Sequence, residues 1–278
     1  MPPILIWNKC IEVKSQGIGY PDYPVINSNI KCPFNCTFTN DRKLYMFYYS
    51  SEMNVSTILF FIHVFCLINE WPQNRREDQN YMMYTVESPT ETLRHYDRKF
   101  LTNKFLNSSA TYRLDSSVFI PYDALTRITP TTPKEYIWDQ EEVVARVKNK
   151  TKLAFQAISH CNATSGRDLI STRLQKLIGL EVVGICFRRG CNDECYNRNI
   201  ETHMFYLALE NNICQNYVTE KFWNSLRSLT VPVVFSRSVF EGMDVPSNAF
   251  IALDDFKSVN EFVAHLKALQ NDTERYLK

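Results

Sequence analysis

Short apolar segments alternate with amphipathic segments along the second half of the chain. The apolar segments lie at residues 152–159, 181–187, 204–210, 231–235 and 250–253. They are rich in β-branched and aromatic residues, which is typical of buried strands. Between them, residues 167–180 and 219–229 place apolar side chains at helical spacing, and Ser258 with Glu261 forms a capping box that opens a last helix. This alternation predicts a parallel sheet with helices on both faces.

The pattern in the first half is weaker. Residues 4–7, 57–63 and 81–86 are predicted strands. The longest apolar run, residues 57–68, contains His63 and is shorter than the roughly 18 residues that indicate a membrane-spanning helix. We therefore predict a buried strand there.

A Pro/Thr-rich stretch that begins at Thr129 separates the two halves, and a charged helical segment at residues 140–148 follows it. We predict an α/β protein with one domain at residues 1–148 and a second at residues 149–278.

The composition is that of a globular protein, because 45% of the 278 residues are hydrophobic. The net charge of +1 gives nucleic acid no electrostatic footprint, so we expect no nucleic-acid partner. Nine cysteines and several N-x-S/T sequons favour an oxidising, luminal compartment. The sequons begin at Asn35, Asn54, Asn107, Asn149, Asn162 and Asn271. The start of the chain lacks the pattern of a signal peptide, so either the protein is cytosolic or its targeting segment lies outside this sequence.

The cysteines cluster, Cys32 with Cys36 and Cys186 with Cys191 and Cys195. Disulfides are the simpler interpretation, and the odd number of cysteines leaves at least one thiol outside pairs within the chain. A zinc site built from Cys191, Cys195 and His203 is the alternative, although a fourth ligand is not evident.

Familiar catalytic and phosphate-binding motifs are absent from the sequence. The seven glycines form neither G-x-G-x-x-G nor a Walker loop, and G-x-S-x-G, H-E-x-x-H and D-x-D are also missing. A nucleotide would therefore have to be held by side chains and helix N-termini.

A site is expected at the carboxyl ends of the predicted parallel strands, where open parallel sheets bind their ligands. His160 and Arg167 follow the strand at 152–159, and Asn211 and the segment 217–221 follow the strand at 204–210. Thr219 is a good N-cap, which would place Glu220 and Lys221 in a first helical turn. Arg167, Lys221 and two helix N-termini would then form a diphosphate site. The alternative is that Thr219 and Glu220 only cap a helix.

Glu87 lies at the carboxyl end of another predicted strand, where Pro89 turns the chain. A carboxylate at this position can act as a general base, or it is only an exposed acid at a strand end. Arg113 can pair with Asp115, or it can face the cleft between the halves together with His160.

Together these residues resemble the α-1,3-fucosyltransferase family. The segment F-Y-L-A-L-E-N-N, residues 205–212, is followed by Y-V-T-E-K-F-W at 217–223 and V-P-V-V at 231–234, in the order that the family pattern has. Further blocks match around Glu87-Ser88-Pro89 and around Tyr112-Arg113. The resemblance covers nearly the whole chain and is strongest over residues 81–278.

The resemblance implies a GT-B-type α/β fold of two Rossmann-like domains, GDP-fucose as donor, and transfer with inversion. It implies no obligatory metal or cofactor, although Mn²⁺ can stimulate such enzymes. Glu87 looks like the catalytic base, and Arg167 and Lys221 look like the diphosphate clamp. Four further residues look like donor contacts: Tyr206, Asn211, Tyr217 and Glu220. The expected acceptor is an N-glycan or an N-acetyllactosamine-type glycan, with core and Lewis-type positions both open.

The sequence also departs from the family pattern. His160 stands where the family usually has Asn, Ser236 replaces a glycine, and the chain stops before a C-terminal helix that crosses back to the first domain. The family places its members in the Golgi lumen as type II membrane proteins, but the expected anchor is not in this sequence. A truncated, inactive relative that binds nucleotide or glycan is therefore the alternative function.

Overall fold

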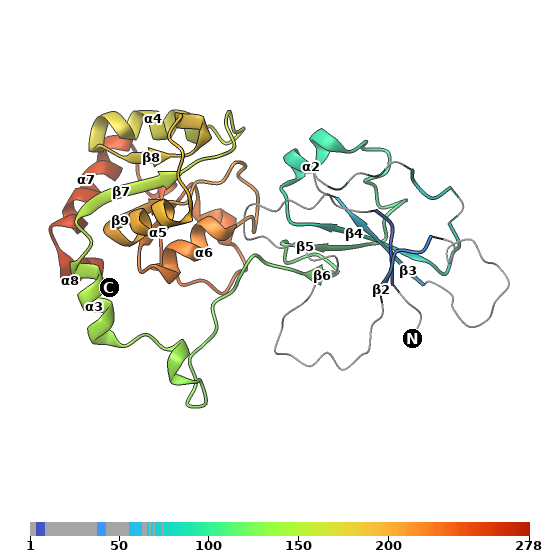
Figure 1. The fold of residues 1–278 in the computed structure, drawn as a ribbon, viewed down its shortest axis with the longest axis horizontal. Coiled ribbons are helices and arrows are strands. Elements are labelled where there is room, and N and C mark those ends of the chain that lie inside the picture. The colour runs from blue at the N-terminus through green and yellow to red at the C-terminus, as the bar shows by residue number, and fades with distance from the viewer. Residues whose placement is uncertain are drawn as a thin grey trace. The chain divides into compact units, whose positions relative to one another are not determined.

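The strands of this protein form two parallel sheets, one in each of two compact units, Met1–Pro121 and Tyr122–Lys278 (Figure 1). The computed structural model describes residues 4–8, 38–42, 56–62, 66, 68, 70–73 and 75–278. The predicted α/β class is confirmed in both units. The unit boundary differs from the predicted one at residue 148, because Val143 and Val147 pack into the core of the second unit.

The described strands of the first unit form a six-stranded sheet in the order β2-β1-β3-β4-β5-β6. They are β1 (Ile4–Ile6), β2 (Phe38–Thr39), β3 (Thr57–Phe61), β4 (Asn80–Thr85), β5 (Ser108–Thr111) and β6 (Val118–Phe119), and α2 (Pro89–His95) follows β4. The predicted strands at 4–7, 57–63 and 81–86 correspond to β1, β3 and β4. His63 and the cysteines at 32 and 36 lie outside the described residues.

The second unit has a five-stranded sheet in the order β11-β10-β9-β7-β8. Its strands are β7 (Lys152–Ala157), β8 (Glu181–Val183), β9 (His203–Leu207), β10 (Val231–Val234) and β11 (Ile251–Ala252). The α-helices are α3 (Gln140–Lys148), α4 (Arg167–Ile178), α5 (Asp193–Thr202), α6 (Glu220–Arg227), α7 (Val259–Gln270) and α8 (Thr273–Tyr276). The alternation of strands and helices predicted from the sequence is confirmed.

Side chains along each central strand alternate between two apolar layers. Phe205 and Leu207 of β9 face the layer formed with α3, α4, α7 and α8, whereas Tyr206 faces the layer formed with α5 and α6. Figure 1 shows α5 and α6 on one side of this sheet. Both faces are therefore covered, which explains why these strands are continuously apolar in sequence. None of the helices in the described ranges is long and apolar enough to cross a membrane.

The strand predicted at 181–187 is wrong beyond Val183. Gly184 has φ 109°, a conformation that side chains disfavour, and it turns the chain into a 3-10 helix, η2 (Ile185–Phe187). A Cβ atom built on Gly184 would lie 2.1 Å from the carbonyl oxygen of Ile158. Close approach of the chain after β8 to the chain after β7 therefore requires glycine here.

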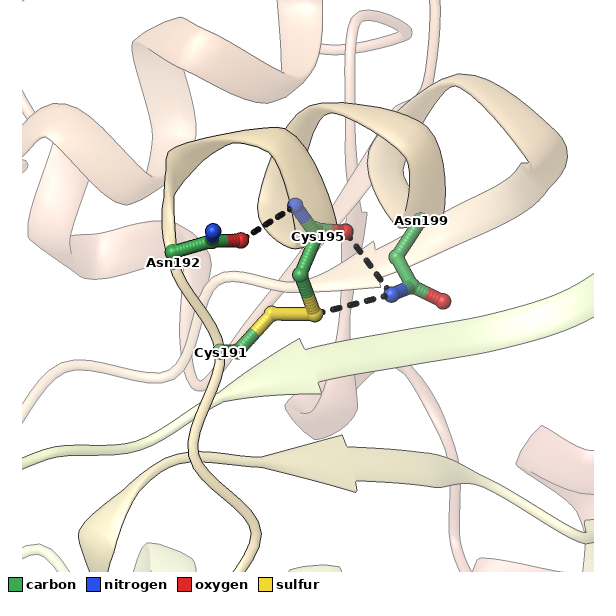
Figure 2. Close-up of a disulfide and its surroundings, with 4 residues drawn as sticks. All are labelled: Cys191, Asn192, Cys195 and Asn199. Carbon is green, nitrogen blue, oxygen red and sulfur yellow. Dashed lines mark hydrogen bonds between the residues drawn. A yellow bond between two sulfur atoms is a disulfide. The ribbon is translucent and has the colours of Figure 1, made fainter.

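Two disulfides lie near the ends of these strands. Cys161 after β7 is bonded to Cys186 in η2, and Cys191 is bonded to Cys195. Figure 2 shows that the second disulfide lies at the start of α5, where Asn192 accepts a hydrogen bond from the Cys195 N–H. The disulfide interpretation is confirmed, and the zinc alternative is wrong because both sulfur atoms are used. Cys214 keeps its thiol.

Replacing Gly184 with alanine should lower the free energy of unfolding by about 2–4 kcal/mol, because the new methyl group meets a backbone carbonyl at an unfavourable φ. Gly190→Ala is the control, since a Cβ there meets nothing within 4 Å and the change should stay within about 0.5 kcal/mol. Chemical unfolding of the two variants measures the difference, and equal stabilities would contradict the role of Gly184.

A second prediction concerns His203, which is 1% exposed at the start of β9. Burial lowers the pKa of its imidazole, against the opposing effect of Glu181, while Lys152 and Lys150 lower it further. The folded state therefore resists protonation at pH values where an unfolded histidine, with a pKa of about 6.5, takes up a proton.

The protein should accordingly lose stability as the pH falls through about 6.5, and His203→Gln should lose less over the same interval. Thermal unfolding of both proteins from pH 7.5 to 5.5 measures the two slopes. Parallel pH dependence in both proteins would show that His203 is not responsible.

Candidate donor-binding site

In the sheet of the second unit, the order in which the chain adds strands reverses between β7 and β9. From β7 the chain passes through α4 to β8 at the edge, and then through α5 to β9 on the other side of β7. The connections that leave the carboxyl ends of β7 and β9 therefore diverge, and ligands of open α/β sheets bind at such a point. These two connections carry most of the predicted site residues: His160, Arg167, Asn211, Tyr217, Glu220 and Lys221.

A buried carboxylate, that of Glu210, lies in the connection after β9. Its Oε1 accepts hydrogen bonds from the backbone N–H of Thr219, at 3.0 Å, and from the Thr219 hydroxyl, at 2.6 Å. Thr219 is the N-cap residue of α6, as predicted, but its hydroxyl does not cap the helix. Glu210 therefore fixes the start of α6 from the neighbouring turn.

Lys221 brings its ammonium into the same cluster. Nζ donates hydrogen bonds to Thr219 Oγ1 and to Glu220 Oε1, both at 2.9 Å. It also lies 3.2 Å from Glu210 Oε2, an ion pair, although that oxygen accepts no hydrogen bond from the described residues. The start of α6 thus holds one cation between two carboxylates.

The electrostatics keep this cation charged. Burial alone would lower the pKa of the Lys221 ammonium, but Glu210 and Glu220 outweigh it and raise the pKa above its ordinary value. Burial raises the pKa of the Glu210 carboxyl, against the opposing effect of Lys221. For Glu220 burial also opposes ionisation, but Lys221 lowers its pKa overall. Lys221 is therefore a permanent positive charge at physiological pH.

Arg167, the first residue of α4, joins the two connections. It is 2% exposed, and its guanidinium donates to the carbonyl of Leu209 at 3.0 Å and to that of His160 at 2.8 Å. Burial lowers the pKa of Arg167, against the opposing effect of Glu210, and Arg167 in turn lowers the pKa of Lys221. The two predicted cations therefore act on one site, while contact of Arg167 with a diphosphate stays a prediction.

The predicted donor contacts differ in their surroundings. Asn211 is partly exposed, but its Oδ1 is buried without a hydrogen bond from the described residues, so its role as a donor contact stays a prediction. Tyr217 is 3% exposed and meets Tyr122 edge to face at 6.3 Å. Tyr206 is 1% exposed in the layer under α5, where its hydroxyl pairs with Tyr196. Tyr206 thus lies behind the site, and its role as a donor contact stays a prediction.

A small apolar pocket of about 20 Å³ lies beside Glu210. Its lining comes from the connection after β9, from α6 and from the end of β10 onwards. The lining residues are Ala208, Glu210, Asn212, Ile213, Tyr217, Val218, Phe222, Val234, Phe235, Val239 and Phe240. This space holds about one water molecule, so the pocket is a small gap in the apolar packing beside the cluster. Among the described residues no group of His, Cys, Asp and Glu side chains is arranged to hold a metal ion.

The remaining predicted residues belong to the first unit. Glu87 follows β4 and donates its backbone N–H to Thr85 Oγ1, and the next residue, Ser88, caps α2. Its predicted position between a strand and a turn is confirmed, and its catalytic role stays a prediction. Arg113 pairs with Asp115 at 2.6 Å, which is the first of its two predicted alternatives.

Comparison with known families covers both units. Residues 1–123 match the family described as fucosyltransferase, N-terminal, and residues 147–278 match glycosyltransferase family 10 (fucosyltransferase) C-term. The chain belongs to glycosyltransferase family 10, the fucosyltransferases. The N-terminal and C-terminal models of this family thus match, in that order, the segments that form the first and the second sheet of the structure.

Relatives of this fucosyltransferase chain are found in invertebrates and vertebrates. It is 28% identical to alpha-(1,3)-fucosyltransferase fut-5 of Caenorhabditis elegans over 92% of this chain and 68% of that protein. For alpha-(1,3)-fucosyltransferase C of Drosophila melanogaster the identity is also 28%, over 91% and 61%. For 4-galactosyl-N-acetylglucosaminide 3-alpha-L-fucosyltransferase 9 of Rattus norvegicus it is 32%, over 87% and 62%. The chain thus spans about two thirds or less of the length of these relatives.

Solved structures agree on the fold. A crystal structure of an alpha1,3-fucosyltransferase superposes with a TM-score of 0.59 at 17% identity, covering 99% of this chain and 80% of that one. Another, titled as a complex with GDP-fucose, gives a TM-score of 0.54 at 17% identity over 81% and 69%. At this identity the similarity establishes the GT-B-type architecture of the fucosyltransferase chain.

Glu210 is the residue of this fucosyltransferase that sequence reasoning missed as a member of the site. It stands next to Asn211 in the F-Y-L-A-L-E-N-N segment and was visible there as a charge at the end of an apolar strand. A charge in that position is rarely buried unless it is paired, which was the available signal. Its partners come from nine and eleven residues further along the chain, and only folding brings them together.

Replacing Glu210 with glutamine should lower the free energy of unfolding by about 1–3 kcal/mol, since it leaves a largely buried ammonium with one carboxylate fewer. Glu220→Gln should change it by no more than about 0.5 kcal/mol, because Glu220 is half exposed and its ion pair is screened by water. Chemical unfolding compares the two variants. An equal effect of both changes would mean that Glu210 does not hold the start of α6.

Proposed function

We propose that this protein transfers L-fucose from GDP-fucose to a GlcNAc hydroxyl of a glycoprotein glycan, in α-1,3 linkage and with inversion. The observation that carries the proposal is the buried Glu210–Lys221 cluster, which lies where the strand order of the second sheet reverses. The chain that holds this cluster matches both halves of the family. The names of the curated relatives support the α-1,3 linkage.

The donor occupies the second unit. The Lys221 ammonium attracts the diphosphate, and the Arg167 guanidinium adds positive charge from beneath. Because both cations lie in a largely buried setting, they stabilise negative charge on the departing GDP more strongly than they would in water. Asn211, Tyr217 and Glu220, in the connection after β9 and at the start of α6, supply polar contacts to the base or to the sugars.

Catalysis is a single displacement at the fucose anomeric carbon. Glu87 removes the proton from the acceptor hydroxyl as that oxygen attacks, and the bond to the diphosphate breaks on the opposite face of the sugar. This geometry inverts the anomeric configuration. No metal is needed for charge stabilisation in this scheme, although Mn²⁺ can stimulate by pairing with the diphosphate.

The acceptor is an N-glycan or an N-acetyllactosamine-type glycan, and the protein acts in the Golgi lumen as part of a type II membrane protein. Two disulfides and four exposed sequon asparagines support a luminal location, since disulfides and N-glycans form in that compartment: Cys161–Cys186, Cys191–Cys195, Asn107, Asn149, Asn162 and Asn271. A non-catalytic relative that binds the nucleotide is the second candidate, favoured by the main-chain hydrogen bonds that engage Arg167.

Incubation with GDP-fucose and an N-glycan or N-acetyllactosamine acceptor tests the activity. Glu87→Gln should lower kcat by about 10²–10⁴-fold while GDP still stabilises the protein against heat, because a general base contributes only to the chemical step. Glu91→Gln, on the helix that follows Glu87, is the control and should retain activity.

Two outcomes would contradict parts of this proposal. A loss of only a few-fold in Glu87→Gln would remove Glu87 as the base. Stabilisation by GDP with no transfer to any acceptor would favour the non-catalytic candidate.

A further inference from the structure

The Lys221 ammonium is surrounded by oxygens of its own protein. Nζ lies 2.9 Å from Thr219 Oγ1, 2.9 Å from Glu220 Oε1 and 3.2 Å from Glu210 Oε2. An ammonium group has three hydrogens to donate. A phosphate oxygen can therefore bind Lys221 closely only by replacing one of these three oxygens.

The three partners differ in how firmly they are held. The Glu210 side chain is 10% exposed, and its other oxygen is fixed by two hydrogen bonds to Thr219. Thr219 is 2% exposed and belongs to the start of α6. The Glu220 side chain is 49% exposed, and its carboxylate accepts a hydrogen bond from the Lys221 ammonium at the solvent-facing side of the cluster. Glu220 is therefore the partner that can leave with the least disruption.

The balance of charges in the cluster also indicates that Glu220 is the partner that leaves the Lys221 ammonium. Glu210 and Glu220 balance Lys221 and the buried Arg167, so the cluster is neutral as it stands. A nucleotide diphosphate adds negative charge, and it would be repelled by a carboxylate that remained on the Lys221 ammonium. Movement of Glu220 away from Nζ removes that repulsion and leaves its oxygens available to sugar hydroxyls.

We propose that Glu220 is an exchangeable counter-ion of Lys221: donor binding replaces the Glu220 carboxylate on Nζ with a phosphate oxygen, while Glu210 and Thr219 keep the ammonium in place. This inference rests on the proposed function and deepens it. No covalent bond changes in the exchange, and only hydrogen-bond partners are redistributed.

The exchange couples two parts of the donor. A ligand with both a diphosphate and sugar hydroxyls gives Lys221 a new acceptor and gives Glu220 new donors. Inorganic pyrophosphate displaces Glu220 in the same way but offers it no hydroxyl. The site therefore discriminates against bare polyphosphates, because they break an ion pair and leave the released carboxylate beside their own charge.

Glu220→Gln gives the two ligands opposite expected responses. Pyrophosphate should bind about twofold to fivefold more tightly, the size of an exposed ion pair that no longer competes. GDP-fucose should bind about tenfold or more weakly, because a charged acceptor for its hydroxyls is lost. Isothermal titration of both ligands, with the wild-type chain and with Glu220→Gln, measures the dissociation constants.

Two further variants distinguish the exchange of Lys221 partners from the general effect of removing one negative charge from the protein. Glu141→Gln removes an exposed carboxylate from the first turn of α3 and should leave both affinities unchanged. In a Lys221→Met background, Glu220→Gln should no longer improve pyrophosphate binding, since no ammonium remains to be released. A gain that persists in that background would come from the overall field and would overturn the exchange.

Pyrophosphate affinity that is equal or lower in Glu220→Gln, including undetectable binding by both proteins, would also overturn the exchange. Failure of the proposed function looks different, because the wild-type chain would then transfer no fucose from GDP-fucose to any acceptor. Normal GDP-fucose binding by the wild-type chain without the pyrophosphate gain leaves the fucosyltransferase proposal intact and refutes only the role of Glu220.

Discussion

The donor side of this protein depends on a buried carboxylate. Glu210 holds the N–H and hydroxyl of Thr219 and faces the Lys221 ammonium, so one side chain fixes the start of α6 and the position of its cation. A buried acid is unfavourable unless it is paired and hydrogen-bonded. Here both conditions are met, and the pairing keeps a permanent positive charge at the end of a parallel sheet.

This arrangement replaces the glycine-rich phosphate loop that many nucleotide-binding sheets use. A glycine loop offers backbone N–H groups, whereas this chain offers side-chain cations whose positions are set by neighbouring carbonyls and carboxylates. The buried Arg167 guanidinium joins the two connections through hydrogen bonds to the carbonyls of Leu209 and His160. The carboxylates that position the Lys221 ammonium also neutralise its charge in this structure.

The disulfide Cys161–Cys186 and the glycine at 184 serve the same part of the sheet. Both bring the chain after β8 against the chain after β7, next to the His160 carbonyl that Arg167 holds. The local conformation at the carboxyl end of β7 is therefore fixed by covalent and steric constraints as well as by hydrogen bonds. The candidate site residues on this connection are therefore held rigidly, which suits a site that must place charge accurately.

The sequence by itself determined the alternation of strands and helices in the second unit, the start of α6 at Thr219–Glu220 and the position of Glu87 after a strand. Periodicity and the residue types that begin a helix are local properties, although the Thr219 hydroxyl makes no capping hydrogen bond. It did not reveal the end of β8 at Gly184, the packing of α3 with the second unit, or Glu210 as the centre of the site. Each of these depends on residues that are distant along the chain: the Ile158 carbonyl, the core around Val147, and the Lys221 ammonium. Only the tertiary structure decided them, since burial and ion pairing arise when separate segments meet.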